Sequence, residues 1–210
     1  MLHTETVVTI KNQHEARTDA TRAFVLAAAE KVFVQEGFER AQIETIAKAA
    51  GRTKGSVYAN FRNKDEIFLA VCEKRTKEIF ARLLERVLAC GTQQEAVEQF
   101  RDFLLDLFED NSWPLLMLEF KLYSLRHPET RELWISMQNA IGFADRDVLI
   151  HKMFGKLSVA KERDIDSSMA AISPLLSGLI LEAHFEPELL SPRRSKDLFG
   201  RLLTVLVKTD

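Results

Sequence analysis

Cysteine and long apolar runs are scarce in this 210-residue chain, and each scarcity excludes a class of protein. The two cysteines, Cys72 and Cys90, are too few for a disulfide framework or a CxxC zinc site. The longest stretch without charge, 167–181, contains Pro174 and Gly178 and is too short to span a bilayer. The first residues lack the basic segment and apolar block of a secretory signal. We therefore expect a soluble, cytoplasmic protein with no membrane partner.

A large net charge of either sign is also missing. The chain has 29 Lys and Arg against 31 Asp and Glu, a formal charge of −2, which argues against a uniformly basic nucleic-acid binder. Hydrophobic residues make up 46% of the chain, too many for a disordered one. The length allows one or two domains with a sizeable core.

Proline is absent from the first 113 residues, where helical spacing recurs. One predicted helix has Thr18 or Asp19 as its N-cap and ends at Gly37; its apolar residues are Val25, Ala28, Ala29, Val32 and Phe33. A capping box at 63–66 opens a long helix that ends near Ala89. Later helices fit 93–109, 114–126, 129–153, 161–185 and 195–208. The sequence predicts an all-α fold of about nine helices.

The window between Gly37 and Asn63 predicts two short helices. The first has an apolar face with Ile46 and Ala47 and ends at the tight turn Gly51. Thr53 is placed to cap the second, whose Val57 and Phe61 face inward. The opposite face of the second helix is small and polar, and carries Gly55, Ala59, Arg52 and Ser56.

Charge is concentrated in this window. Between Arg40 and Lys64 there are six basic residues and one acidic residue, Glu44, a local balance of +5. Two short helices, a glycine turn and a basic surface are what a DNA-binding helix-turn-helix needs, since phosphate contacts set its register and the second helix reads base edges. A solvated helical hairpin that is merely basic would show the same pattern.

The order of these residues resembles the N-terminal domain of TetR-family transcriptional regulators over residues 18 to about 70. The resemblance is carried by Val25-Leu26-x-Ala28-Ala29-x-x-Val32-Phe33-x-x-x-Gly37-Phe38, Ile46-Ala47-x-x-Ala50-Gly51 and Lys54-Gly55-x-x-Tyr58-x-x-Phe61-x-x-Lys64. It implies a three-helix DNA-binding domain, joined by a fourth helix to an all-α domain for ligand binding and dimerisation. We therefore expect a flexible arm (1–17), a helix-turn-helix domain (18–64) and an effector and dimerisation domain (65–210).

The resemblance also assigns roles in DNA binding. Lys54 and Gly55 would begin the recognition helix, Tyr58 and Lys64 would contact phosphates, and the variable positions Ser56, Ala59 and Asn60 would select bases. Asn60 suits an adenine edge and Ala59 a thymine methyl. Two positions depart from the family pattern. Arg52, beside Thr53 in the turn, would contact a phosphate or a guanine; Gln42 replaces the usual Ser or Thr and is a poor cap.

Residues 65–210 carry 24 acidic and 19 basic residues, so this part would be repelled by DNA. Its helices are rich in aromatic residues and methionine, a pattern that usually marks plain core. In the family an apolar effector enters among these helices, and such side chains suit hydrophobic or aromatic molecules. The candidates are Phe103, Met117, Phe120, Tyr123, Trp134 and Met137.

The last two helices are apolar around most of their circumference and need cover on two sides. In the family they pair with their copies, so we predict an isologous homodimer and a palindromic operator. The interface candidates are Ile172, Leu175, Leu176, Leu179, Leu202, Val205 and Leu206.

An enzyme is the remote alternative, because no HExxH, GxSxG, P-loop or dinucleotide motif is present. Two pairs at helical spacing, Asp147 with His151 and His184 with Glu188, could each supply two metal ligands, but solvated histidines are the simpler interpretation. We expect no catalytic residue, no metal and no cofactor. Three hypotheses remain: a repressor released by a small effector, a DNA-binding regulator without an effector, and an all-α enzyme with an incidental basic hairpin.

Overall fold

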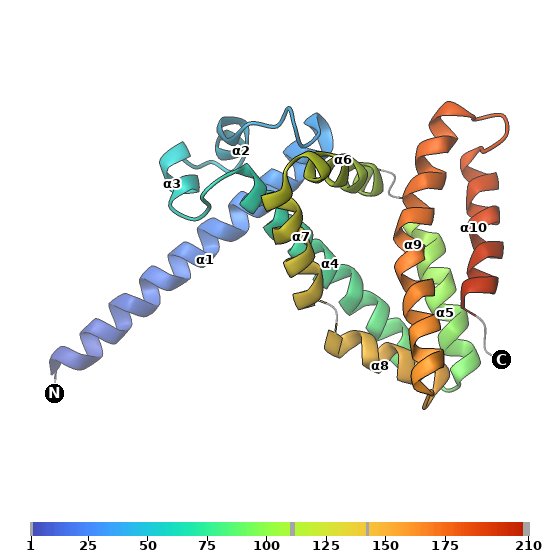
Figure 1. Ribbon diagram of the computed structural model, residues 1–210. Helices are drawn as coiled ribbons and strands as arrows, with labels where there is room; N and C mark the ends of the chain where they lie inside the picture. Colours follow the sequence, from blue (N-terminus) through green and yellow to red (C-terminus); the bar gives the residue numbers. More distant parts are fainter. Residues whose placement is uncertain (1, 110–111, 142, 208–210) are drawn as a thin grey trace. The chain divides into compact units, whose positions relative to one another are not determined.

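The computed structural model describes the backbone of residues 2–109, 112–141 and 143–207 and the side chains of 19–109, 112–137 and 146–207. Within these residues the chain forms ten α-helices and one short 3-10 helix, η1, without strands (Figure 1). This confirms the all-α fold, with one helix more than the nine expected. The helices are α1 (Leu2–Glu36), α2 (Ile43–Ala49), α3 (Lys54–Tyr58), α4 (Lys64–Leu88), α5 (Gln93–Asp106), η1 (Leu107–Glu109), α6 (Ser112–Arg126), α7 (Pro128–Ile141), α8 (Phe143–Phe154), α9 (Val159–Phe185) and α10 (Pro192–Leu206).

Two predicted boundaries were wrong. The single helix expected over 129–153 is two helices, α7 and α8, on either side of residue 142. The first helix begins at Leu2 rather than at Thr18 or Asp19, although it ends before Gly37 as expected. Gly37 has a φ of 79°, a left-handed conformation that glycine adopts without a steric cost.

The chain divides into two compact units, unit 1 (Met1–Arg75) and unit 2 (Thr76–Asp210). Unit 1 therefore extends about three turns into α4, past the boundary predicted after residue 64, because the start of α4 packs into its core. The backbone of residues 2–17 lies within α1, while the side chains of this stretch lie outside the described residues. The flexibility of the arm stays a prediction.

Three phenylalanine rings form the centre of unit 1. Phe33, Phe38 and Phe68 are fully buried, and Phe68 lies edge-on to both others with ring centroids 5.0 Å apart. Edge-to-face contacts of this kind add to the gain from burying apolar area. The three rings come from α1, the following loop and α4, so they hold together the elements that precede and follow α2 and α3 in the chain.

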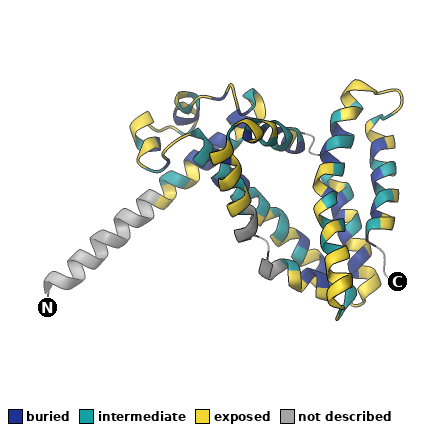
Figure 2. Cartoon of the chain, viewed as in Figure 1, coloured by how far each residue is buried: buried dark blue, intermediate teal, exposed yellow. Residues whose placement is uncertain are grey.

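Unit 2 has a separate core in which α5, α8, α9 and α10 surround the last turns of α4. Its buried residues include Val87, Phe100, Met153, Phe199 and Leu203. α9 packs against both α10 and α6, and α6 packs against α7. Buried and exposed residues alternate around α9 and α10 in Figure 2, as amphipathic helices require.

Among the described residues, α9 has the length and apolar composition that would allow it to cross a membrane, contrary to the expectation from its charge-free stretch. Core helices of soluble proteins share this composition, and Ile172, Leu176 and Ile180 of α9 lie in the unit 2 core. Only 22% of the apolar window is buried within the chain, so much of its surface is open to further contacts. The absence of a membrane partner stays a prediction.

Candidate nucleic-acid interface

The helix α2 begins without a side-chain cap and ends in a well-formed turn. Gln42 occupies the N-cap position, and its side chain makes no capping hydrogen bond, in line with the poor capping expected of glutamine. At the other end Arg52 N–H donates to Ala47 O and Gly51 N–H donates to Lys48 O, the Schellman pattern. Gly51 has a φ of 62°, so this turn requires glycine or a residue tolerant of the left-handed region.

The helix α3 is only five residues long and depends on its cap. The Thr53 hydroxyl accepts a hydrogen bond from Ser56 N–H at 3.2 Å, which confirms the predicted cap. Val57 is fully buried, while Lys54, Gly55, Tyr58 and the following Ala59 are exposed. A Cβ added at Gly55 would meet nothing nearer than 4.0 Å, so crowding does not explain this glycine. The polar face of α3 is therefore open to a large ligand.

The ten predicted DNA contacts all retain some exposure. Gln42, Arg52, Thr53, Lys54, Gly55, Tyr58 and Ala59 are exposed, and Ser56, Asn60 and Lys64 are half-buried. Asn60 donates one side-chain N–H to Ser56 O at 2.9 Å, a bond that leaves its second N–H and its Oδ1 for a base edge. Lys64 donates to Glu39 O at 2.8 Å and lies over the Phe38 ring, 4.7 Å from its centroid. These contacts tie the end of the interface to the core of unit 1.

The side chains around α3 also include three that sequence reasoning missed. Arg22 of α1 lies 4.3 Å from the Phe61 ring centroid and donates to Asn60 O, which fixes the end of the recognition helix. Phe24, also of α1 and 56% exposed, lies 4.9 Å below the Arg52 guanidinium. The third is Glu44 of α2, which forms an ion pair with Lys54. Helical spacing could have placed Phe24 outside the core, but the contacts join residues 28 and 38 positions apart, beyond any local pattern.

The link between α3 and α4 is capped by side chains as predicted, with one change. Asn63 Oδ1 accepts a hydrogen bond from Glu66 N–H at 2.8 Å. The Glu66 carboxylate reaches back to Arg62 N–H at 2.7 Å rather than to Asn63 N–H. Both contacts satisfy amide groups at the start of α4 and hold the segment after the recognition helix in place.

The six effector candidates of unit 2 divide into two groups. Phe103 is buried in the core with α9 and α10, whereas Phe120, Tyr123 and Trp134 form an aromatic cluster on α6 and α7. The Phe120 and Trp134 ring centroids are 5.5 Å apart, and Tyr123 stacks on His127 at 4.0 Å. Met117 and Met137 are half-buried on the same two helices.

Two polar groups on α6 accompany this cluster, and the sequence did not single them out. Lys121 is half-buried, and burial lowers the pKa of its ammonium. Ser124 is 4% exposed, and its hydroxyl has no hydrogen-bond partner among the described residues. A buried hydroxyl without a partner is uncommon and is satisfied when a polar ligand or water reaches it.

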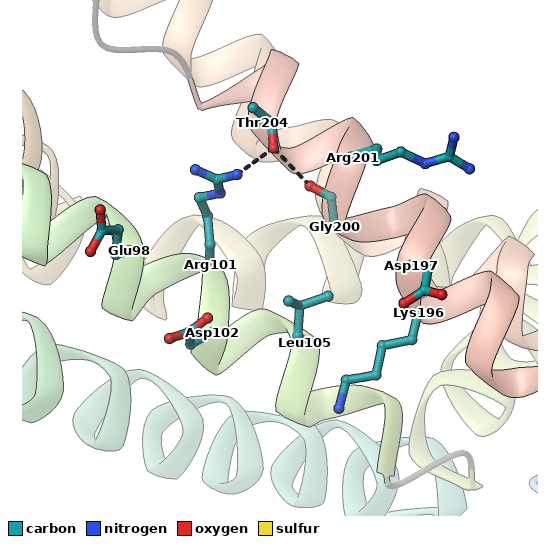
Figure 3. A pocket seen from close by; sticks show the side chains of 9 residues that line it. All are labelled: Glu98, Arg101, Asp102, Leu105, Lys196, Asp197, Gly200, Arg201 and Thr204. Carbon is teal, nitrogen blue, oxygen red and sulfur yellow. Dashed lines mark hydrogen bonds between the residues drawn. The ribbon is translucent and has the colours of Figure 1, made fainter.

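A described cavity lies elsewhere in unit 2, and Figure 3 shows the side chains that line it. It is an open groove of about 700 Å³ between α5 and α10, lined by charged residues and crossed by a hydrogen bond from Arg101 to Thr204. None of the six effector candidates lines it. The groove residues are Glu98, Arg101, Asp102, Leu105, Lys196, Asp197, Gly200, Arg201 and Thr204.

The seven interface candidates on α9 and α10 also differ among themselves. Ile172 and Leu176 are buried in the core of unit 2 and can contribute little to a partner's surface. Val205 is 64% exposed, and the others are half-buried: Leu175, Leu179, Leu202 and Leu206.

Metal and thiol chemistry have little support in this part of the chain. The described residues contain no group of three or more His, Cys, Asp or Glu that could hold a metal ion. Burial raises the pKa of the Cys72 thiol well above its usual range.

The helix α3 is capped, follows a glycine turn, and is exposed within a basic segment. Together with α2 and the supporting helix α1, it forms a helix-turn-helix DNA-binding domain. Residues 25–71 match the model described as bacterial regulatory proteins, tetR family. The chain therefore carries the N-terminal DNA-binding domain of the TetR family, as its motifs predicted.

The chain is also similar to curated relatives and, in its fold, to solved structures. The chain is 29% identical to the transcriptional repressor AcnR of Corynebacterium efficiens over 126 residues, which are 60% of this chain and 62% of that protein. The fatty acid degradation regulator FadR of Bacillus halodurans has a similar fold, with a TM-score of 0.65 at 16% identity over 89% of this chain and 94% of that one. SmeT, the repressor of a Stenotrophomonas maltophilia multidrug efflux pump, in its complex with triclosan matches with a TM-score of 0.52 at 26% identity, over 90% of this chain and 92% of that one.

Proposed function

We propose that this protein is a cytoplasmic, homodimeric transcriptional repressor that binds a palindromic operator and is released from it by a small effector. The observation that carries the proposal is the exposed polar face of α3 inside a segment with a charge balance of +5. Basic side chains supply affinity for phosphates, while the small and amide side chains of α3 read base edges. The similarity to AcnR and SmeT, both repressors, favours repression over activation.

The homodimer is supported by the surface of α9 and α10. Val205 is exposed, and Leu175, Leu179 and Leu202 are only half-covered by the chain itself. Removing this apolar area from water favours association with a second copy through the same face. Two recognition helices related by a two-fold axis would then meet half-sites of a palindrome.

An apolar or aromatic effector is supported by the aromatic cluster of α6 and α7. Tyr123 and Trp134 are half-buried, so part of each ring is accessible, and both contact the fully buried ring of Phe120. On α6, the half-buried Lys121 and the Ser124 hydroxyl, which has no partner among the described residues, are candidate polar contacts. SmeT has been solved with triclosan, a small aromatic molecule, and shares 26% identity with this chain. Binding here would weaken DNA affinity only if it favours a conformation that binds DNA less well.

A regulator that binds DNA without a small effector is the second candidate. The observation that favours it is the charged lining of the described groove between α5 and α10, which does not suit an apolar ligand. A thermal-shift screen of apolar and aromatic compounds separates the two. An effector must both stabilise the protein and release it from DNA; if no compound does both, the second candidate stands.

DNA binding is tested by selecting bound duplexes from a random pool and measuring affinity by fluorescence anisotropy over a range of salt. We expect an enriched palindrome bound with a steep salt dependence. Tyr58→Ala should weaken binding to the selected and to scrambled duplexes alike, by about tenfold for one lost phosphate contact. Asn60→Ala should change which bases are preferred at one position of each half-site. No enrichment of any sequence would leave the all-α enzyme as the remaining hypothesis.

A further inference from the structure

Glu44 stands out because it is the only acidic residue between Arg40 and Lys64. It lies in the first turn of α2 and is exposed on the segment that carries the six basic residues. A carboxylate at such a place repels DNA phosphates and lowers affinity for every sequence. An acidic residue in the first turn of a helix interacts favourably with the helix dipole, which accounts for an acid at this position of α2. The dipole does not account for the cation that Glu44 contacts.

The cation is Lys54, the first residue of the recognition helix α3. Its ammonium forms an ion pair and hydrogen bond with the Glu44 carboxylate, and both side chains are about half exposed. Their hydrogen bond is the main cause that lowers the pKa of Glu44 and raises the pKa of Lys54. The same ammonium lies 5.8 Å from the ring centroid of Tyr58. In the protein without DNA, this cation therefore already has an internal anionic partner.

We propose that Glu44 determines specificity by holding Lys54 back from nonspecific phosphates. This inference rests on the proposed DNA-binding function. A phosphate alone must displace the carboxylate and gains little in exchange, because one surface ion pair replaces another. A guanine edge carries no net charge, so Lys54, which has three N–H donors, can donate to O6 or N7 and keep its ion pair with Glu44 while neighbouring contacts of α3 hold it in register. Glu44 therefore lowers nonspecific affinity more than operator affinity.

The matched substitutions are Glu44→Gln and Glu36→Gln. Each removes one negative charge from unit 1, but Glu36 lies in the last turn of α1, away in sequence from the Lys54 pair. Affinities are measured by anisotropy on the selected operator and on a scrambled duplex across a series of NaCl concentrations. For Glu44→Gln we expect about fivefold tighter binding to the scrambled duplex and less than about twofold on the operator. The salt slope on the scrambled duplex should steepen by about 0.9 for each recognition helix.

The double variant with Lys54→Gln shows whether the effect runs through the lysine. In the Lys54→Gln background, adding Glu44→Gln should raise affinity for the scrambled duplex by no more than the small increase seen with Glu36→Gln. The inference is overturned if Glu44→Gln and Glu36→Gln act alike, if both duplexes gain equally, or if the gain persists without Lys54. A wild-type protein that enriches no duplex from the pool would instead overturn the DNA-binding function itself.

Discussion

The two units differ in the kind of apolar surface that they leave exposed. Among the side chains of unit 1 that the structure describes, two of the three large exposed hydrophobic residues are aromatic rings beside cations, Phe24 under Arg52 and Tyr58 near Lys54. In unit 2 the exposed residues are mostly aliphatic and lie on helix faces, among them Leu122, Leu133 and Val205. Rings beside cations hold positive charge at fixed positions for a polyanion, whereas aliphatic side chains gain only from cover by another apolar surface.

The cores differ in the same sense. Unit 1 is the smaller unit and has one aromatic cluster at its centre, while unit 2 spreads its core over five helices. A small core makes each large side chain more important, because less area remains to compensate for its loss. Substitutions in unit 1 should therefore act on folding of the DNA-binding domain, and those on the surface of unit 2 should act on assembly.

The largest effect is expected from Phe68→Ala at the centre of unit 1. Phe68 is fully buried and contacts both Phe33 and Phe38, so truncation leaves a cavity and should cost about 3–5 kcal/mol of unfolding free energy. Urea unfolding followed by circular dichroism measures the loss. Val34→Ala in the same unit, on an exposed residue of α1, is the control and should cost less than about 1 kcal/mol. Equal losses would show that the aromatic cluster is not the main support of unit 1.

The next effect concerns the aliphatic surface of unit 2. Val205→Glu places a charge in the proposed interface from both copies, so like charges meet or are buried without partners. We expect the dimer dissociation constant to rise by at least about 100-fold, with the helical content unchanged. Sedimentation velocity measures the association. Val159→Glu, on a residue of α9 with similar exposure and outside the proposed interface, should leave the dimer intact. Dissociation by both variants would move the interface away from α10.

The sequence predicted local features of these units more reliably than their long-range contacts. The Thr53 cap, the Gly51 turn and the Asn63 contact each depend on neighbours within five positions, and all three are present. The break between α7 and α8 was missed although Gly142, a residue type that disfavours helix interiors, stands between Ile141 and Phe143 in the sequence.

Burial on α9 and the stacking of Arg52 depend on how helices pack. Ile172 and Leu176 repeat with the same spacing as Leu175 and Leu179, so hydrophobicity alone could not tell that the first pair is buried in the core and the second only half-buried against it. The stacking of Arg52 on Phe24 required α1 to pass beneath the turn before α3, which no local pattern encodes. For the same reason the six effector candidates could be identified as apolar but not divided between the core and the α6–α7 cluster.

A smaller effect is expected at the cap of α3. Thr53→Ala leaves Ser56 N–H without its partner and should cost about 1 kcal/mol of stability, with weaker DNA binding because so short a helix frays. Thr53→Ser retains the accepting hydroxyl and should behave as the wild type. Thermal unfolding and anisotropy are measured on the same samples. If serine fails to restore both properties, the threonine acts through something other than its cap.

The smallest effect is expected at Lys121 in unit 2 and depends on pH. Burial lowers the pKa of this lysine, so at neutral pH the folded state holds a charge that the unfolded state solvates better. This loss of folding stability is complete at pH values below the pKa of Lys121 in the folded state. It declines as the pH rises toward the ordinary lysine pKa of about 10.4, because the unfolded chain then loses the proton as well. Lys121→Met should therefore stabilise the protein by less than about 1 kcal/mol at pH 7, and by less still above pH 10. Lys156→Met, on the exposed loop before α9, should change the unfolding midpoint little at either pH. A gain for Lys121→Met that does not decline at high pH would show that added apolar contact, rather than the buried charge, is responsible.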